Sequence, residues 1–225
     1  MTYDLFIGDR TFSSWSLRGW LMLEKFGLPY RTTLIGLYSG TMADDMAPLA
    51  PARLVPTLRL PDGTVMSETV AMAETLHERH PEAAMWPADA AARATARWLM
   101  AEMAVGFSAL RTACPMQLSH VNEGFAVSEA VAADLQRIEA LWAHARGFAG
   151  DGPWLFGAYS LADAFYAPVC ARIVGYDLPV GAFARDYCEA TLSDPAFQAW
   201  RAEGLKITYD PMPYNMGGPT RDWPV

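Results

Sequence analysis

The stretch VPTLRLPDGTVMSETVAMAETLHERH, from Val55 to His80, decides the fold. A proline cannot donate to a β-ladder, so the Val-Pro pair predicts that a strand begins at Thr57. Two short runs of β-forming residues joined by Pro-Asp-Gly predict a hairpin over Thr57–Ser67. From Glu68 to His80 the apolar residues follow helical spacing, with four facing inward: Val70, Met72, Ala73 and Leu76. The stretch therefore predicts a β-β-α unit.

The residues before this unit predict the rest of an N-terminal domain. Alternating apolar and turn-forming segments indicate, in order, a strand over Tyr3–Gly8, a helix over Trp15–Phe26, a strand over Tyr30–Ile35 and a short helix over Met42–Ala47. The full order is β-α-β-α-β-β-α, the order of a thioredoxin-like domain. We assign residues 1–80 to this α/β domain.

The residues after it predict a second domain made only of helices. Residues 81–90 are read as a linker, residues 91–205 as an all-α helical bundle, and residues 206–225 as an irregular aromatic tail lying over the surface. The expected helices are Ala91–Leu118, Glu123–Phe148, Leu161–Tyr176, Phe183–Thr191 and Pro195–Glu203.

Composition excludes several classes of partner. The 225 residues carry a net charge of −8 without a basic run, which argues against binding to nucleic acid or an anionic membrane surface. No signal peptide and no apolar run long enough to span a bilayer is visible. The three cysteines are far apart, so neither a disulfide framework nor a zinc site is expected. His77 and His80 are expected on an exposed helix face, without a metal. The sequence predicts a soluble cytoplasmic protein.

Two segments suggest a peptide-binding site, each with an ordinary structural alternative. A cis bond at Val55-Pro56 would present the Val55 N–H and C=O to an extended peptide, whereas a trans bond is the commoner X-Pro geometry. Glu68 and Thr69 stand where a strand ends and a helix begins. At this position Glu68 can hold an ammonium group, while Thr69 and its N–H hold a carboxylate. Alternatively, the two residues only begin the helix.

A third segment, GAYSLADAFYAPV from Gly157 to Val169, has a structural role whether or not the first two segments form a binding site. Ser160 and Asp163 have the spacing of a capping box, in which each side chain accepts a hydrogen bond from the other residue's backbone.

Together these motifs resemble the glutathione S-transferase superfamily over about residues 1–205. The V-P pair, the acidic-hydroxyl pair at Glu68-Thr69 and S-x-A-D at Ser160–Asp163 occur in the family's order. The stretch SSWSLR, from Ser13 to Arg18, looks like the loop of the zeta class and of other serine-type classes. The resemblance implies a thioredoxin-like domain followed by an all-α helical domain.

The same resemblance implies a glutathione site with Ser13 facing the sulfur and Ser14 as the competing donor. The glutathione-binding residues it implies are Arg53, Val55, Pro56, Glu68 and Thr69. Leu54 replaces a polar residue that usually contacts glutathione, so Arg53 is expected to supply that contact. Trp15 stands where zeta enzymes carry a cysteine used in maleylacetoacetate isomerisation.

In this setting the serine is a hydrogen-bond donor to a thiolate. Lowering a thiol pKa from about 8.5 by about two units requires roughly 2.7 kcal/mol of preferential stabilisation of the thiolate. One charge-assisted hydrogen bond of about 1.5–3 kcal/mol, with about 0.3–1 kcal/mol from the helix dipole, is sufficient. Either Ser13 or Ser14 can donate it, since a one-residue shift of the helix cap exchanges their roles.

The expected reaction is transfer of glutathione, the co-substrate, to an apolar electrophile, as in detoxification. The electrophile pocket is expected between the domains, beside Phe12, Trp15, Met103 and Phe107. Homodimerisation is implied by the resemblance. The alternatives are a protein of the same fold that binds ligands without catalysis, a glutathione-dependent isomerase, and a thiol-disulfide oxidoreductase. The thiol-disulfide oxidoreductase is disfavoured because this chain has no cysteine near Ser13 that could form a mixed disulfide.

Overall fold

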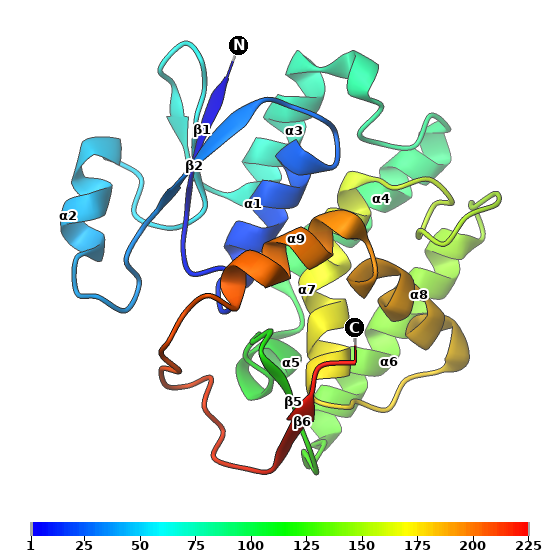
Figure 1. Ribbon diagram of the computed structural model, residues 1–225. Helices are drawn as coiled ribbons and strands as arrows, with labels where there is room; N and C mark the ends of the chain where they lie inside the picture. The colour runs from blue at the N-terminus through cyan, green and yellow to red at the C-terminus, as the bar shows by residue number, and fades with distance from the viewer. Residues whose placement is uncertain (1, 225) are drawn as a thin grey trace.

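Figure 1 shows the computed structural model of the chain, which describes residues 2–224. A small sheet flanked by helices lies at one side, and a larger group of helices lies at the other. The elements in chain order are β1 (Tyr3–Ile7), α1 (Ser14–Glu24), β2 (Tyr30–Leu34), α2 (Met42–Met46), β3 (Thr57–Arg59), β4 (Val65–Met66), α3 (Thr69–Arg79), α4 (Ala90–Val105), α5 (Ser108–Ala113), β5 (His120–Asn122), α6 (Glu129–Arg146), α7 (Leu161–Gly175), α8 (Ala182–Leu192), α9 (Pro195–Gly204) and β6 (Thr220–Asp222).

The first sheet has the thioredoxin-like arrangement predicted from the sequence. Its strand order is β2-β1-β3-β4, with β1 and β2 parallel and the remaining pairs antiparallel. The hairpin between β3 and β4 is present, and the Val55-Pro56 bond is cis. The fold class is therefore confirmed: an α/β thioredoxin-like part followed by a mainly helical part.

The two faces of this sheet are covered by different helices. Because side chains alternate along a strand, Leu5 and Ile7 of β1 join the main core with α1 and α3, while Phe6 points to the opposite face. There Phe6 packs in a small cluster with Ile35, which follows β2, and with Met46 and Leu49, which lie in α2 and in the short 3-10 helix after it. Figure 1 accordingly shows α2 apart from α1 and α3, across the sheet.

Helix α7 is the centre of the helical part. Nearly all its residues are buried, as expected for a helix that is apolar on every side. Its start is the predicted capping box, in which Asp163 accepts from the Ser160 N–H at 2.8 Å. The Asp163 carboxylate also accepts from the Leu155 N–H and the Tyr187 hydroxyl, each at 3.0 Å.

Arg18 joins the two parts. It is buried at 1% exposure in α1, and its Nε donates to the Phe165 carbonyl of α7 at 2.9 Å. Its Nη1 donates to the Ser14 carbonyl at 3.2 Å. Trp20 of α1 also packs on Trp200 of α9, with ring centroids 5.2 Å apart. Helix α1 therefore contacts both the sheet and the helical part.

The structure corrects the predicted helix over Ala91–Leu118. The chain leaves α4 at Gly106, where a Cβ would lie 2.7 Å from the Glu102 carbonyl oxygen. Phe107 then has a left-handed backbone, with φ of 55°, before α5 begins. Apolar spacing continues through the break because α4 and α5 both face the core, so the sequence shows one helix where the chain forms two.

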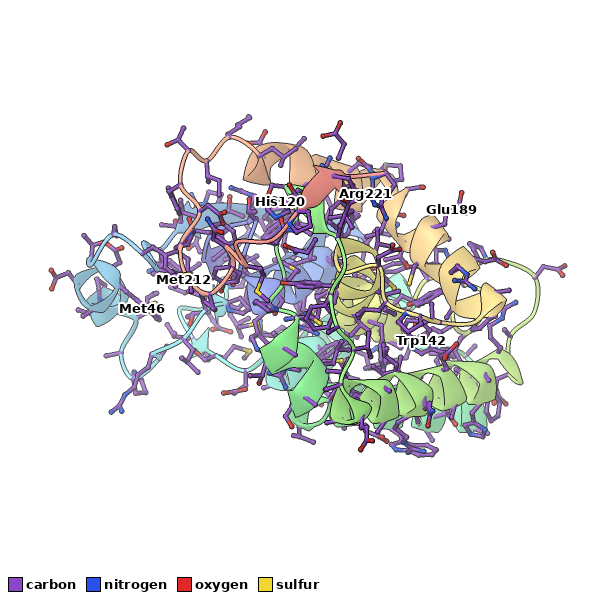
Figure 2. All side chains as sticks on the ribbon, turned by 90° about the horizontal axis from the view of Figure 1, so that it is seen from below. Met46, His120, Trp142, Glu189, Met212 and Arg221 are labelled. Carbon is purple, nitrogen blue, oxygen red and sulfur yellow. The ribbon has the colours of Figure 1, made fainter. Side chains whose placement is uncertain are left out.

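The second correction concerns the tail and the segment it pairs with. The helix predicted from Glu123 begins at Glu129, and β5 precedes it. Thr220–Asp222 of the tail form β6 and pair antiparallel with β5, so the tail is not wholly irregular. Figure 2 shows His120 and Arg221 side by side at this pairing, and Met212 on the side of the molecule that carries α2.

Two further features bear on earlier expectations. His77 and His80 are half-buried rather than exposed, and the His80 ring lies 2.7 Å from the Tyr3 hydroxyl. Across residues 2–224, no helix is long and apolar enough to cross a membrane, and no group of three or more His, Cys, Asp or Glu side chains has a metal-binding arrangement.

Candidate active site

The site is built around the start of α1, where Ser13 is the N-cap. Its Oγ accepts from the Ser16 N–H at 3.3 Å and donates to Ser16 Oγ at 2.8 Å. Ser16 Oγ in turn accepts from the Gly8 N–H at 2.9 Å. Ser13 is only 8% exposed. The structure thus gives the cap to Ser13, whereas the sequence paired a Ser14 cap with Ser13 as the sulfur donor. Capping uses only an acceptor site of the hydroxyl, so a Ser13 cap does not by itself exclude donation by Ser13.

Ser14 occupies the first position of the helix and is half-buried. Its Oγ accepts from Nη2 of Arg172 at 3.4 Å, a contact that reaches across from α7. The two neighbouring serines therefore face different surroundings: Ser13 faces the loop after β1, and Ser14 faces the helical part.

A cavity of about 330 Å³ lies beside the Val-Pro turn. Its lining residues come from α1, the turn before β3, and the start of α3: Trp15, Leu54, Val55, Pro56, Glu68 and Thr69. Among residues 2–224, the Val55 backbone N–H and C=O have no hydrogen-bond partner. They are thus available to an extended peptide, which is the role the sequence suggested for them.

The start of α3 completes this cavity. Glu68 is the N-cap residue, but its side chain makes no capping hydrogen bond and is exposed. Its φ is 72°, an unusual value for a non-glycine residue. The first amides of α3 therefore lack a side-chain acceptor, an arrangement that suits a carboxylate. Val55, Pro56, Glu68 and Thr69 thus fit the head group and backbone of a small peptide such as glutathione.

Arg53 lies elsewhere. It is exposed and lines a separate hollow with Met42 and Met46 of α2, whereas Leu54 borders the cavity beside the Val-Pro turn. The structure therefore does not bring Arg53 together with the other four residues proposed to bind glutathione.

A second cavity of about 330 Å³ lies between the two parts of the chain, on the other side of Trp15. It is lined by Ser14, Trp15, Ser108, Arg111, Thr112 and Arg172. This lining is polar and cationic, in contrast to the apolar pocket predicted from the sequence. Trp15 borders both cavities, so ligands in the two would be neighbours.

The other residues predicted for the electrophile pocket do not border this cavity. Met103 is completely buried, Phe107 is 6% exposed, and both belong to the main core. Phe12 is covered by the tail, with the Tyr214 ring centroid 4.4 Å away. Met103 and Phe107 thus serve the core, whereas Phe12 lines a separate hollow with residues of the tail.

Arg111 and Arg172 were missed, although Arg172 carried a recognisable signal: it is a cation inside the almost wholly apolar run of α7. Arg172 is buried, and its Nε donates to the Cys114 carbonyl at 2.9 Å. Burial lowers the pKa of Arg172 to about 10, and the neighbouring Arg111 guanidinium adds to this lowering. Burial also lowers the pKa of Arg111.

The comparisons with known proteins agree with this geometry. Residues 12–79 match the family model described as the N-terminal domain of glutathione S-transferase. Two curated relatives are each 32% identical: a probable maleylacetoacetate isomerase of Caenorhabditis elegans, over 51% of this chain and 52% of the relative, and a maleylacetoacetate isomerase of Dictyostelium discoideum, over 40% and 42%. The chain thus spans about half the length of the curated relatives it matches.

Solved structures extend the similarity to almost the whole chain. A Burkholderia glutathione transferase homologue with bound glutathione is 25% identical, with a TM-score of 0.67 over 92% of this chain and 100% of that one. A maleylacetoacetate isomerase from Anaeromyxobacter dehalogenans, with glutathione in its active site, is 29% identical, with a TM-score of 0.62 over 88% and 94%. Residues 12–79 therefore match the N-terminal domain of the glutathione S-transferase family, and the chain as a whole has the glutathione transferase fold.

Proposed function

We propose that this protein is a glutathione transferase that binds glutathione beside the Val-Pro turn and stabilises its thiolate with the hydroxyl of Ser13. The observation that carries the proposal is the cavity between the start of α1 and the start of α3. It combines the unpaired Val55 backbone with uncapped amides of α3. These groups suit the peptide backbone and a carboxylate of glutathione, and α1 begins beside them.

The hydrogen bonds around Ser13 support its role as donor. A hydroxyl has one hydrogen and two acceptor sites, so the Ser13–Ser16 bond can reverse its direction when an anion arrives. Ser16 Oγ would then accept from the Gly8 N–H and donate to Ser13 Oγ, which already accepts from the Ser16 N–H. The Ser13 hydrogen is thereby free for the thiolate, at the end of a chain of mutually polarised bonds.

The reaction we propose begins with loss of the glutathione thiol proton to solvent. The sulfur lone pair then attacks an electrophilic carbon, forming a C–S bond while a leaving group departs with its electron pair or a conjugated double bond accepts the pair. Ser13 acts as a donor throughout, so no general base beside it is needed.

Isomerisation is the second candidate, supported by the names of the curated relatives. In that reaction the thiolate adds to a conjugated cis double bond, rotation follows about the new single bond, and the thiolate is expelled to leave the trans isomer. Trp15 takes the place of the zeta-class cysteine in this chemistry, so transfer remains our principal proposal. A third, non-catalytic alternative is a protein with the same fold that binds ligands without catalysing a reaction.

Three further parts of the proposal rest on family resemblance. We propose a homodimer, a cytoplasmic location, and a role in detoxification of electrophiles. Each can be tested without reference to the site, for example by measuring molecular mass in solution.

The rate of glutathione conjugation in Ser13→Ala and Ser14→Ala tests the proposal. Loss of one charge-assisted hydrogen bond corresponds to a fall of about 10- to 100-fold in kcat/KM for Ser13→Ala at neutral pH. Ser14→Ala, the matched control one residue along, is expected to lose less. The reverse order would move the donor role to Ser14, and unchanged rates in both variants would remove serine activation from the mechanism.

A further inference from the structure

The loop between β1 and α1 is held from outside by α9 and the tail, a set of contacts that the proposed reaction does not use. Figure 1 shows the end of α9 beside the start of α1, with the tail running from there to β6. We propose that Tyr209 of the tail is a positioning residue for Ser13, acting through Asp9. The inference rests on the proposed function, because it names a residue that the serine needs in order to stabilise the thiolate.

Asp9 sets the backbone immediately before α1. Its carbonyl oxygen accepts from the N–H of Ser13 at 2.8 Å and from the N–H of Phe12 at 3.2 Å. These two bonds close a turn that fixes the direction in which the chain enters the helix. Because Ser13 is the N-cap of α1, a shift of Asp9 would move the Ser13 backbone and its Oγ with it.

The carboxylate of Asp9 depends on the tail for its hydrogen bond. Asp9 is 3% exposed, and among residues 2–224 its Oδ2 has no hydrogen-bond partner. Its Oδ1 accepts from the hydroxyl of Tyr209. Burial, to which the Asp9 carboxylate adds, raises the pKa of Tyr209 to about 12, so this hydroxyl stays a donor at neutral pH. A buried carboxylate is costly without partners, so the Tyr209 hydroxyl stabilises the observed position of Asp9.

The middle of the same loop is held by α9. Trp200 donates its Nε1 hydrogen to the Arg10 carbonyl at 2.8 Å, and the Thr11 hydroxyl donates to the Gly204 carbonyl at 2.7 Å. Gly204 lies so close that a Cβ there would be 2.9 Å from Thr11 Oγ1. Helix α9 thus fixes the middle of the loop, while the tail fixes the residue at its start.

The tail itself is tied down on both sides of Tyr209. The Tyr209 ring lies 6.3 Å from the Phe12 ring and 6.4 Å from the Tyr38 ring, measured between centroids. Further along, the Tyr214 ring packs on Phe12, and β6 pairs with β5. Chain ends are ordered when they are anchored in this way. The Tyr209 hydroxyl therefore meets Asp9 from a fixed segment.

The test is Tyr209→Phe, which removes the hydroxyl and keeps the ring. With Asp9 less restrained, the Ser13 hydroxyl is less well placed for the sulfur. We expect the pKa of the bound glutathione thiol to rise by about 0.5–1 unit, which corresponds to about 3- to 10-fold less thiolate at a pH well below that pKa. The affinity for S-methylglutathione, which has no thiol to ionise, should stay the same, because the Val-Pro turn and the start of α3 are untouched.

Tyr30→Phe is the matched control. The Tyr30 hydroxyl also donates to a carboxylate, that of Glu24 at 2.6 Å, but Glu24 lies at the other end of α1 from Ser13. This variant should leave the thiol pKa unchanged. Hydrogen exchange of the Ser13 amide adds a readout that needs no glutathione, since that N–H is bonded to the Asp9 carbonyl. Exchange should be faster in Tyr209→Phe and unchanged in the control.

A double variant tests the route through Asp9. When Tyr209→Phe is added to Asp9→Ala, the thiol pKa should equal that of Asp9→Ala alone, because the bond between the two residues is already lost. An additive rise would contradict the route. If Asp9→Ala does not fold, the thiol pKa and amide exchange of Tyr209→Phe decide the inference by themselves.

The outcomes separate this inference from the proposed function. A wild-type thiol pKa in Tyr209→Phe, together with a raised pKa in Ser13→Ala, would overturn the inference and leave serine activation standing. Unchanged exchange of the Ser13 amide would also overturn it, since the loop would not depend on the tail. If Ser13→Ala itself leaves the thiol pKa unchanged, the proposed function fails and the positioning role fails with it, even where faster exchange shows that Tyr209 holds the loop.

Discussion

Single residues at the start of α1 and α7 have roles that can be separated by their hydrogen bonds. Ser13 lies in a short chain of hydrogen bonds beside the proposed sulfur position, whereas Ser14 Oγ accepts a hydrogen bond from Arg172 of α7. Asp163 is buried and accepts only from groups of its own fold, so its role is structural. Adjacent residues of one type can thus act in different sites, and a sequence motif alone does not separate them.

Asp163→Asn provides a test at this scale. An amide keeps the shape, but its NH2 group must replace one acceptor oxygen, either Oδ1, which accepts from Leu155 and Tyr187, or Oδ2, which accepts from Ser160. About 2–3 kcal/mol of unfolding free energy should therefore be lost. Chemical denaturation measures the change. Asp186→Asn, on an exposed part of α8, is the matched control and should have little effect.

The pH dependence of the unfolding free energy of wild type and Asp163→Asn gives a second test. Burial raises the pKa of the Asp163 carboxyl above its ordinary value, and its hydrogen bonds only partly oppose this. A raised carboxyl pKa contributes stability that is present below the unfolded-state pKa of about 3.9 and is lost as pH rises through the folded-state pKa. The stability of the wild type relative to Asp163→Asn should therefore decline across that window. A flat difference would contradict the raised pKa.

At the scale of elements, the break between α4 and α5 positions part of the lining of the second cavity. Because the chain turns at Gly106 and Phe107, α5 presents Ser108, Arg111 and Thr112 to the cavity beside Trp15. The tail packs against the loop before α1: the Tyr214 ring lies on Phe12, and the Tyr214 hydroxyl accepts a hydrogen bond from the Tyr38 hydroxyl at 2.7 Å. Local breaks and long-range pairing thus shape the site as much as the regular helices do.

Gly106→Ala tests the importance of the break. A Cβ would lie 2.7 Å from the Glu102 carbonyl oxygen, a backbone atom that cannot move aside cheaply. We expect a loss of about 1–3 kcal/mol in unfolding free energy, because α5 must shift. Gly150→Ala, where nothing lies within 4 Å of the added Cβ, is the control for thermal denaturation. Equal melting temperatures for the two variants would show that the break tolerates a side chain.

At the scale of the whole molecule, the two parts share one hydrophobic core. The main cluster of buried residues includes Leu5 of the sheet, Leu17 of α1, Phe165 of α7 and Trp200 of α9. Arg18 adds a buried hydrogen bond between α1 and α7. The proposed boundaries near residues 80 and 90 therefore divide the chain by topology, while packing connects the parts.

A common core predicts that the chain unfolds in a single transition. Far-ultraviolet circular dichroism reports the helices, and tryptophan fluorescence reports both Trp20 and Trp200; the two signals should give coincident denaturation curves. Separate midpoints would mean that the sheet part and the helical part unfold independently, despite the contacts of α1 with α7.

The sequence predicted the order of strands and helices in the N-terminal part, the hairpin after the Val-Pro pair, and the capping box, because each depends on local patterns: alternation, turn residues and fixed spacing. It left the cis and trans forms of the Val55-Pro56 bond open. It failed at Gly106 because both flanking helices are apolar toward one core, so periodicity runs through the break. It missed β5 and β6 because their three-residue strands pair over about a hundred residues of chain. The polar lining of the second cavity could not be predicted, because Arg111 and Arg172 come from helices far apart in the sequence and meet only in the folded chain.

The most direct test of the central claim is the pKa of the glutathione thiol when bound. Thiolate absorbance should be followed as a function of pH in wild type, Ser13→Ala and Ser14→Ala, at saturating glutathione. The account predicts a bound-thiol pKa about two units below the free value of about 8.5 in wild type, and a return of about one to two units toward that value in Ser13→Ala. A wild-type pKa near 8.5, or the same lowered pKa in Ser13→Ala, would contradict it.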